Sequence, residues 1–184
     1  MAKAVLQKNW YDVQAPSIFD EDTVAETPAE KESQVYGRTV KEGLNDLMES
    51  ADKYYADVVL KVTDVEGNKA FTEISEMKCS SEFVSRMIRE GSDRFDFVHD
   101  LETADDRTVR IKLVGATLRR TSSKKLTAAR NKIKELLNEK GEEQSYEEIM
   151  ENIFADNIQD EIRDEVDTIY PFRQLEIRKT ELLD

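Results

Sequence analysis

Two pairs of apolar segments constrain the fold of this chain most strongly, and in each pair one segment, 58–62 or 109–113, has an apolar residue at every second position. The first pair covers residues 58–62 and 71–74 around the turn Glu66-Gly67-Asn68, and the second covers residues 95–101 and 109–113. A period of two is typical of strands that bury one face, and a short turn between two such segments indicates a β-hairpin. The chain is therefore predicted to contain at least two antiparallel hairpins.

Helical spacing is found in four segments after the first hairpin. Apolar residues recur every three or four positions in segments 83–88, 126–137, 145–154 and 156–169, and Ser145 to Glu148 forms a capping box. After these helices, residues 172–179 alternate again, and an isolated strand must pair with a sheet made earlier. The predicted fold class is α+β, an antiparallel β-barrel-like core with flanking helices and a C-terminal helical segment followed by a returning strand.

The predicted organisation has three parts. Residues 1–34 form an extended N-terminal segment and an acidic loop, residues 35–118 a β-rich core with one inserted helix, and residues 119–184 a basic loop, helices and the final strand packing back on the core. The proline-containing, acidic stretch 20–33 is expected to be a surface loop. Core packing is the expected place of Trp10, with stacking on RNA as the alternative for Trp10 and Tyr11.

One stretch inverts the charge of its surroundings. Residues 107–134 hold ten Lys and Arg and no Asp or Glu. Removing these ten from the 27 basic residues leaves 17 against 40 acidic ones, so the remainder of the chain carries a formal charge of −23. Gathered cations release counterions from phosphates, which indicates a polyanion-binding face. A solvated charged hairpin and helix is the plainer alternative.

Alternation also sets the direction of two of these cations. Because Val109, Ile111 and Leu113 point inward, Arg110 and Lys112 are expected to lie together on the solvent side. The segment 119–125 follows with no apolar anchor after Leu118, and its serines are expected to cap the next helix.

Bulk composition limits the class of protein. The net charge of −13 fits either a protein adapted to a salty cytoplasm or an ordinary acidic interaction protein. Cys79 is the single cysteine, so the chain has no internal disulfide and no cysteine zinc site. Residues 1–10 lack the apolar h-region of a signal peptide, so none is expected, and no stretch approaches the roughly 18 apolar residues of a membrane span. A soluble, cytoplasmic protein is expected.

Catalytic chemistry has little support in the sequence. His99 is the single histidine and has no nucleophile motif beside it, while Asp105-Asp106 occupies a predicted turn that favours aspartate locally. No calcium loop or glycine-rich phosphate loop is present. We therefore expect no enzyme activity, no metal, no cofactor and no small-molecule substrate.

Five motifs lie along the chain: the opening segment 8–16 with Phe19, Tyr36-Gly37-Arg38, the hairpin residues 63–67, the stretch 115–120 and the closing segment 169–179. Each motif is modest alone, but five in register are specific. In this order they resemble the archaeal and eukaryotic small-subunit ribosomal protein family S3Ae (eS1). The likeness covers nearly the whole chain, and its acidity resembles versions from salt-adapted archaea.

The resemblance implies a cytoplasmic, non-enzymatic ribosomal protein that supports translation as part of the small-subunit ribonucleoprotein. It would bind ribosomal RNA on the platform near the mRNA exit, with neighbouring ribosomal proteins and mRNA near the exit as the implied partners. The implied and charge-derived RNA-binding residues are Lys8, Arg38, Arg110, Lys112, Arg119, Arg120, Lys124, Lys125, Arg130, Lys132, Arg178 and Lys179. Family members often have a longer basic tail, whereas only Lys3 and Lys8 precede Trp10 here.

A rival hypothesis comes from another class. The stretch from Glu135 to Ile169 holds thirteen acidic and two basic residues. These acidic helices could dock a basic partner protein while the basic stretch only balances them internally. Survival of a complex after ribonuclease digestion would favour this protein-interaction module.

Overall fold

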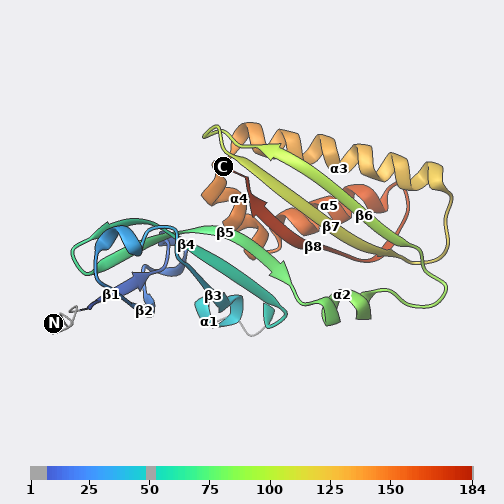
Figure 1. Ribbon diagram of the computed structural model, residues 1–184. Helices are drawn as coiled ribbons and strands as arrows, with labels where there is room; N and C mark the ends of the chain where they lie inside the picture. The colour runs from blue at the N-terminus through green and yellow to red at the C-terminus, as the bar shows by residue number, and fades with distance from the viewer. Residues whose placement is uncertain (1–7, 49–52, 184) are drawn as a thin grey trace, which may run out of the picture. The chain divides into compact units, whose positions relative to one another are not determined.

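The computed structural model describes residues 8–48 and 53–183, and the chain divides into two compact units between Glu76 and Met77. Within the described residues there are eight strands and five α-helices (Figure 1). The strands form an open sheet and do not close into a barrel. The predicted α+β class with a barrel-like core is confirmed in this open form.

The first unit begins with two strands, β1 (Asn9–Gln14) and β2 (Thr23–Ala29), which pair antiparallel. The expectation of a loop throughout residues 20–33 was therefore wrong. Within the described residues β2 pairs with β1 alone, and an edge strand tolerates Pro28, which has no N–H to donate.

Tyr11 and Val13 of β1 are buried in the core of this unit, while Trp10 is 59% exposed. Adjacent residues of a strand point to opposite faces, so burying Tyr11 turns Trp10 outward. The expectation that Trp10 packs in the core was wrong.

Three further strands complete the first unit. They are β3 (Thr39–Gly43), β4 (Ala56–Glu66) and β5 (Lys69–Cys79), and the short helix α1 (Leu44–Met48) follows β3. The predicted first hairpin is β4–β5, and Gly67 takes φ +61° in its turn. One pairing is parallel, between residues 12–14 of β1 and residues 69–71 of β5.

The second unit contains the last three residues of β5 and three antiparallel strands. These are β6 (Arg94–Glu102), β7 (Thr108–Thr117) and β8 (Phe172–Leu182), in the spatial order β6-β7-β8. The second hairpin and the returning C-terminal strand are both as predicted. The register of β7 and β8 shifts between Lys112 and Leu113, which leaves Arg178 as an extra residue in β8.

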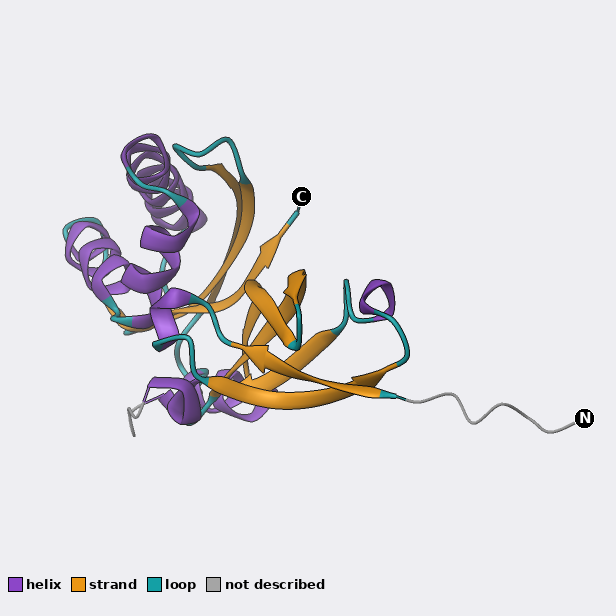
Figure 2. Cartoon of the chain, turned by 90° about the vertical axis from the view of Figure 1, so that its left-hand side faces the viewer, coloured by secondary structure: helices purple, strands orange, loops and turns teal. Residues whose placement is uncertain are grey.

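Four helices belong to the second unit: α2 (Ser81–Met87), α3 (Ser123–Glu143), α4 (Tyr146–Phe154) and α5 (Asn157–Asp167). Helix α3 packs on β6 and helix α5 on β8, so both lie along the sheet of this unit (Figure 2). The predicted Ser145–Glu148 capping box is present. Ser122 occupies the N-cap of α3, but its side chain makes no capping hydrogen bond.

Helix α3 continues past Gly141, although this glycine was expected just beyond its end. A Cβ atom at position 141 would lie 2.3 Å from the carbonyl oxygen of Glu102 and 2.6 Å from Leu101 Cδ1. The glycine therefore serves a close approach between α3 and β6, which sequence spacing alone cannot distinguish from a helix stop.

Candidate nucleic-acid interface

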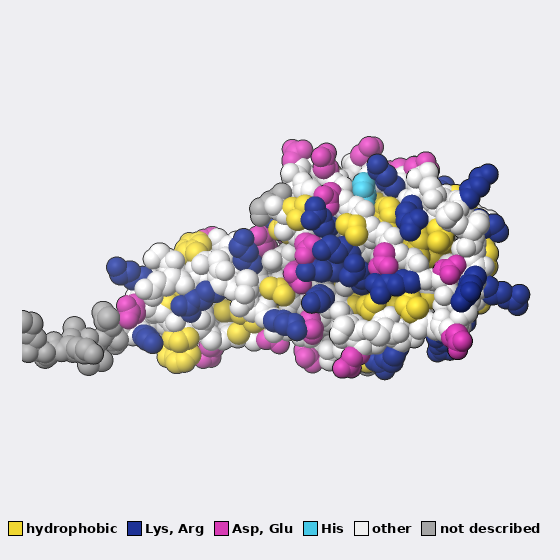
Figure 3. Space-filling model, turned by 45° about the vertical axis from the view of Figure 1, so that its right-hand side comes forward, with side chains coloured by type: hydrophobic (Ala, Val, Ile, Leu, Met, Phe, Trp, Pro, Cys, Tyr) yellow, Lys and Arg dark blue, Asp and Glu magenta, His cyan; other side chains and the backbone are white. Residues whose placement is uncertain are grey.

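The sheet of the second unit turns a charged face away from α3 and α5. Val109, Ile111 and Leu113 are fully buried, and Arg110 and Lys112 alternate with them as predicted. On this face Lys112 of β7 lies opposite Lys179 of β8. Figure 3 shows a dense group of Lys and Arg side chains on the second unit, with acidic side chains among them.

Several of these cations are neutralised by carboxylates of the same face. Lys112 Nζ lies 2.6 Å from Glu181 Oε2, and Lys179 Nζ lies 2.6 Å from Glu181 Oε1. Hydrogen bonds from Lys112 and Lys179 lower the pKa of Glu181. One carboxylate thus fixes the positions of two lysines. The three side chains together carry one net positive charge, whereas the two lysines alone would carry two.

Arg110 is also paired. Its guanidinium donates to Asp100 on β6 through Nε at 2.6 Å and Nη2 at 2.8 Å. This side-chain hydrogen bonding lowers the pKa of Asp100 and raises that of Arg110. The outward direction of Arg110 was predicted correctly, but its partner across the hairpin leaves it little free charge.

A different arrangement is found in the loop before α3. Arg119, Arg120, Lys124 and Lys125 are all exposed, and none forms an ion pair with a carboxylate in the described part of the chain. We call these four residues the loop patch. Because their charge is not internally balanced and they lie within seven positions of the chain, they are well placed to contact phosphates.

Polar contacts from distant residues hold the loop patch in place. The Tyr170 hydroxyl donates to the carbonyl oxygen of Arg119 at 3.1 Å, and Lys125 Nζ lies 4.8 Å from the centre of the Tyr170 ring. The Thr121 N–H donates to Asp93 Oδ2 at 2.8 Å. The loop has no apolar anchor, as its sequence indicates, yet it is anchored by hydrogen bonds and a cation–π contact.

The two predicted cations of α3 have structural partners. Arg130 stacks over Phe95 with 5.0 Å to the ring centre and donates from Nε to Asp96 O at 3.4 Å. Lys132 Nζ lies 3.2 Å from Glu165 Oε2 of α5. For Lys132 the internal balancing of charge that the rival hypothesis requires is observed.

The remaining predicted cations lie elsewhere. Arg38 donates to Thr27 Oγ1 and, at 3.1 Å, to Pro28 O, so it braces β2 within the first unit. Lys8 is exposed before β1, and Lys3 falls outside the described residues. Arg178 lies 3.9 Å from Asp96 Oδ1 on the charged face of the second unit.

Two cations that sequence reasoning missed adjoin Arg178 and Lys179. Lys78 at the end of β5 and Arg94 at the start of β6 line the same hollow as these two residues. Lys78 stands between the apolar residues Met77 and Cys79, so the sequence predicts that it points outward. Both neighbours are buried in the structure. The sequence does not show the strand pairing that brings the end of β5 and the start of β6 beside the middle of β8.

No catalytic arrangement emerges among the described residues. His99 shares a 2.7 Å hydrogen bond with Asn138 on α3, and Cys79 is buried with its thiol donating to Ile177 O at 3.4 Å. No group of His, Cys, Asp and Glu in residues 8–48 and 53–183 has the arrangement of a metal site. Within the same residues, no helix is long and apolar enough to cross a membrane.

Comparison with known proteins gives a consistent family. The model described as "Ribosomal S3Ae family" matches residues 2–184. The small ribosomal subunit protein eS1 of Haloarcula marismortui is 30% identical over 182 residues, covering 99% of this chain and 85% of that protein. The eS1 proteins of Methanopyrus kandleri and Halobacterium salinarum are 32% and 31% identical, covering 96% and 99% of this chain and 86% and 88% of theirs.

Proposed function

This chain belongs to the ribosomal S3Ae family, and on that basis we propose that it is a structural, non-enzymatic constituent of the small ribosomal subunit in the cytoplasm. It binds ribosomal RNA on the platform near the mRNA exit and supports translation. Its partners are small-subunit ribosomal RNA and neighbouring ribosomal proteins, with mRNA adjoining at the exit.

The observation that carries the RNA contact is the loop patch. Four exposed cations without carboxylate partners in the described residues gather within seven positions of an otherwise acidic chain. Phosphates supply the opposite charge, and backbone contacts of this kind fix position without reading base sequence. The paired cations Arg110, Lys112 and Lys132 contribute less to RNA affinity. A phosphate must displace their carboxylate partners, which are Asp100, Glu181 and Glu165 in the same order.

Charge reversal of the loop patch tests this proposal. The variant Arg119→Glu, Arg120→Glu, Lys124→Glu, Lys125→Glu should assemble poorly into small subunits, measured by co-sedimentation in low and high salt. For isolated RNA, the slope of log affinity against log salt should flatten by about one unit for each phosphate that the variant no longer binds.

A matched control changes the net charge equally at other exposed sites. Lys31, Lys69, Arg89 and Arg173 are exposed and lie outside the loop patch, so their reversal to Glu should weaken assembly much less. An equal loss of assembly in both variants would show that assembly depends only on the overall charge of the chain. Unchanged incorporation of the loop-patch variant would refute the proposed contact.

Docking of a basic neighbouring protein is the second candidate. Glu147 and Glu151 on α4 and Asp164 on α5 are exposed, and none forms an ion pair within the described residues. Other carboxylates of α5 are already occupied, since Glu161 lies 2.8 Å from Lys140 Nζ. A pull-down with a ribonuclease control separates the two candidates, because a protein-mediated complex survives digestion of RNA.

A further inference from the structure

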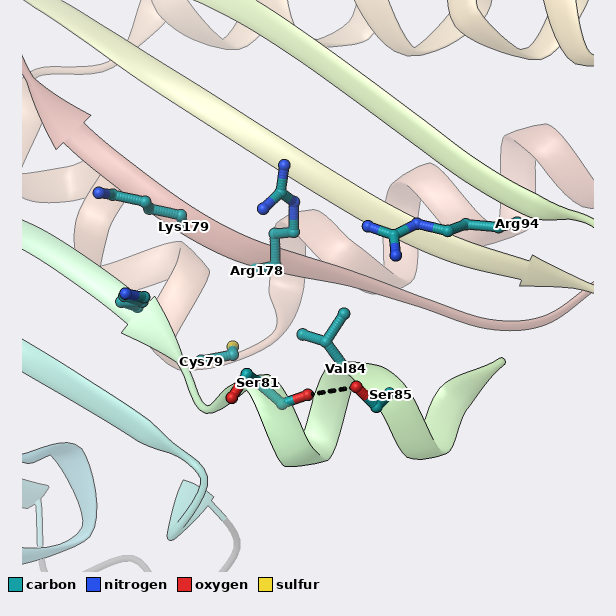
Figure 4. A pocket seen from close by; sticks show the side chains of 8 residues that line it. Cys79, Ser81, Val84, Ser85, Arg94, Arg178 and Lys179 are labelled. Carbon is teal, nitrogen blue, oxygen red and sulfur yellow. Dashed lines mark hydrogen bonds between the residues drawn. The ribbon is translucent and has the colours of Figure 1, made fainter. Parts of the chain in front are cut away.

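A hollow of about 260 Å³ opens on the second unit where β5, α2, β6 and β8 come together. Figure 4 shows it between the outer side of β8 and helix α2. Four of its lining residues are cationic and none is acidic. The lining residues are Lys78, Cys79, Ser81, Val84, Ser85, Arg94, Arg178 and Lys179.

The two arginines of this hollow are oriented by one carboxylate beside it. Asp96 accepts from Arg94 Nε at 2.6 Å and from Arg94 Nη2 at 3.0 Å, and its Oδ1 lies 3.9 Å from Arg178 Nε. In Figure 4 the Arg94 side chain extends toward Arg178, and the Arg178 side chain rises from β8. Asp96 therefore gathers two guanidinium groups at one place, and it is also the anion with which an incoming phosphate must compete for them.

Arg178 retains unused hydrogen-bonding capacity. Its Nε is buried and makes no hydrogen bond within the described structure. A buried guanidinium donor without an acceptor is costly, and an incoming anion would relieve that cost. The single negative charge of Asp96 also falls short of the two positive charges beside it.

The size of the hollow limits the class of ligand. Pockets for drug-sized molecules span roughly 300–1,000 Å³, so about 260 Å³ suits one chemical group of a larger molecule. Guanidinium groups match phosphate oxygens in a bidentate geometry, whereas lysines act as point charges. Val84 and Cys79 supply an apolar wall against which a sugar ring can rest.

We propose that this hollow binds a phosphate group of the RNA backbone, with Arg94 and Arg178 as its hydrogen-bond donors and Lys78 and Lys179 as its surrounding charges. The proposal rests on the proposed RNA-binding function and adds a second contact, apart from the loop patch. Because four cations share one phosphate, neutralising cations of the hollow can remove at most one phosphate contact.

Two exposed members of the hollow allow a test in the full chain. Lys78→Gln and Arg94→Gln remove charge from positions that are exposed, so the fold is retained and can be checked by circular dichroism. Binding of a fluorescein-labelled single-stranded RNA is followed by anisotropy over a range of KCl concentrations. The double variant should bind about tenfold more weakly at low salt, and its salt slope should fall by about one unit.

Non-additivity distinguishes one shared phosphate from two separate ones. Neither single variant should reduce the slope by more than that one unit, and a double variant that reduces it by about two units would overturn the shared site. Arg173→Gln is the matched control, since Arg173 is exposed on the same strand as Arg178 and does not line the hollow. If Arg173→Gln lowers the salt slope as much as the substitutions in the hollow do, the effect is one of general surface charge, and the proposal is overturned.

Asp96→Asn provides a test in which RNA affinity is expected to rise, whereas the other substitutions lower it. Without the competing carboxylate, Arg94 and Arg178 are free for phosphate, so RNA should bind more tightly than to the unchanged protein. A purely structural role of these arginines predicts no gain, because the loss of Asp96 only removes an orienting group. Weaker or unchanged RNA binding by Asp96→Asn contradicts the proposed competition and the site with it.

The outcomes separate this site from the proposed function. If the Lys78→Gln, Arg94→Gln variant binds RNA normally while the loop-patch variant does not, the hollow is refuted and the RNA-binding function stands. If both bind normally, both proposals fail. If the hollow variant binds RNA normally and an oligoglutamate binds the unchanged protein but not the hollow variant, the hollow is assigned to an acidic peptide instead.

Discussion

The hydroxyl of Tyr170 donates a hydrogen bond to the carbonyl oxygen of Arg119, 51 residues earlier in the chain, at 3.1 Å. Tyr170 lies between the end of α5 at Asp167 and the start of β8 at Phe172, so one side chain ties the segment after the helices to the basic loop. The same ring carries Lys125 on its face. The free cations of the loop patch thus project from a fixed backbone.

Removing that hydroxyl should weaken RNA binding with little loss of stability. In Tyr170→Phe the ring can still stack with Lys125, while the hydrogen bond to Arg119 is absent. A single hydrogen bond of this kind contributes about 0.5–1.5 kcal/mol. We expect a fall of a few-fold in RNA affinity, measured by anisotropy, because the loop must be ordered on binding.

Tyr170→Leu is the comparison variant for this prediction. It removes both the hydrogen bond and the cation–π interaction with Lys125, so it should bind RNA more weakly than Tyr170→Phe. Equal binding by all three proteins would show that the loop needs no anchor.

Neutralising Glu181 should affect stability and RNA binding in opposite directions. In Glu181→Gln, Lys112 and Lys179 lose their shared carboxylate, which is about one-quarter exposed. The free energy of unfolding in urea should fall by about 1 kcal/mol, while RNA affinity rises because both lysines become available. A loss of RNA affinity would mean that Glu181 positions these lysines for the nucleic acid.

Acid titration should abolish the stability difference between the Glu181→Gln variant and the unchanged protein. The Glu181 pKa is lowered in the folded state, chiefly by Lys112 and then by Lys179. Its stabilising effect is therefore complete above its unfolded pKa of about 4.3 and is lost as the pH falls through the lower, folded pKa. Melting temperatures of the two proteins should differ at neutral pH and converge in strong acid.

Adding one methyl group at position 141 should destabilise the second unit. The new Cβ would meet the Glu102 carbonyl at 2.3 Å, a backbone atom that cannot move away cheaply. Overpacking of this kind costs about 1–3 kcal/mol, although alanine is otherwise the better helix former. Urea unfolding of Gly141→Ala measures the loss, and Glu139→Ala, exposed on the same helix, should change stability by less than about 0.5 kcal/mol.

Added KCl should stabilise the fold while it weakens RNA binding. The chain has a formal charge of −13, and screening of its self-repulsion favours the compact state. The melting temperature is therefore expected to rise with KCl. A steep rise that continues to molar concentrations fits adaptation to a salty cytoplasm, whereas an early plateau fits an ordinary acidic protein.

Local pattern determined most of the elements. The alternation in residues 109–113 fixed which side of β7 is buried, since a period of two leaves no other choice for a half-buried strand. The spacing of Ser145 and Glu148 likewise placed the start of α4. Where local signals are weak, the prediction failed. We predicted a loop in place of β2, because Glu26 and Pro28 are unfavourable inside a sheet and are tolerated only in an edge strand.

By itself the sequence determined the family, the hairpins, the helices and the stretch in which positive charge gathers, because these depend on residue type and short-range spacing. Only the tertiary structure decided which of those charges are free. Asp100, Glu181 and Glu165 reach their cations across strands and between helices, whereas no carboxylate among the described residues reaches Arg119 or Arg120. Ion pairing depends on distances of a few ångströms, and these are set by the pairing of distant segments.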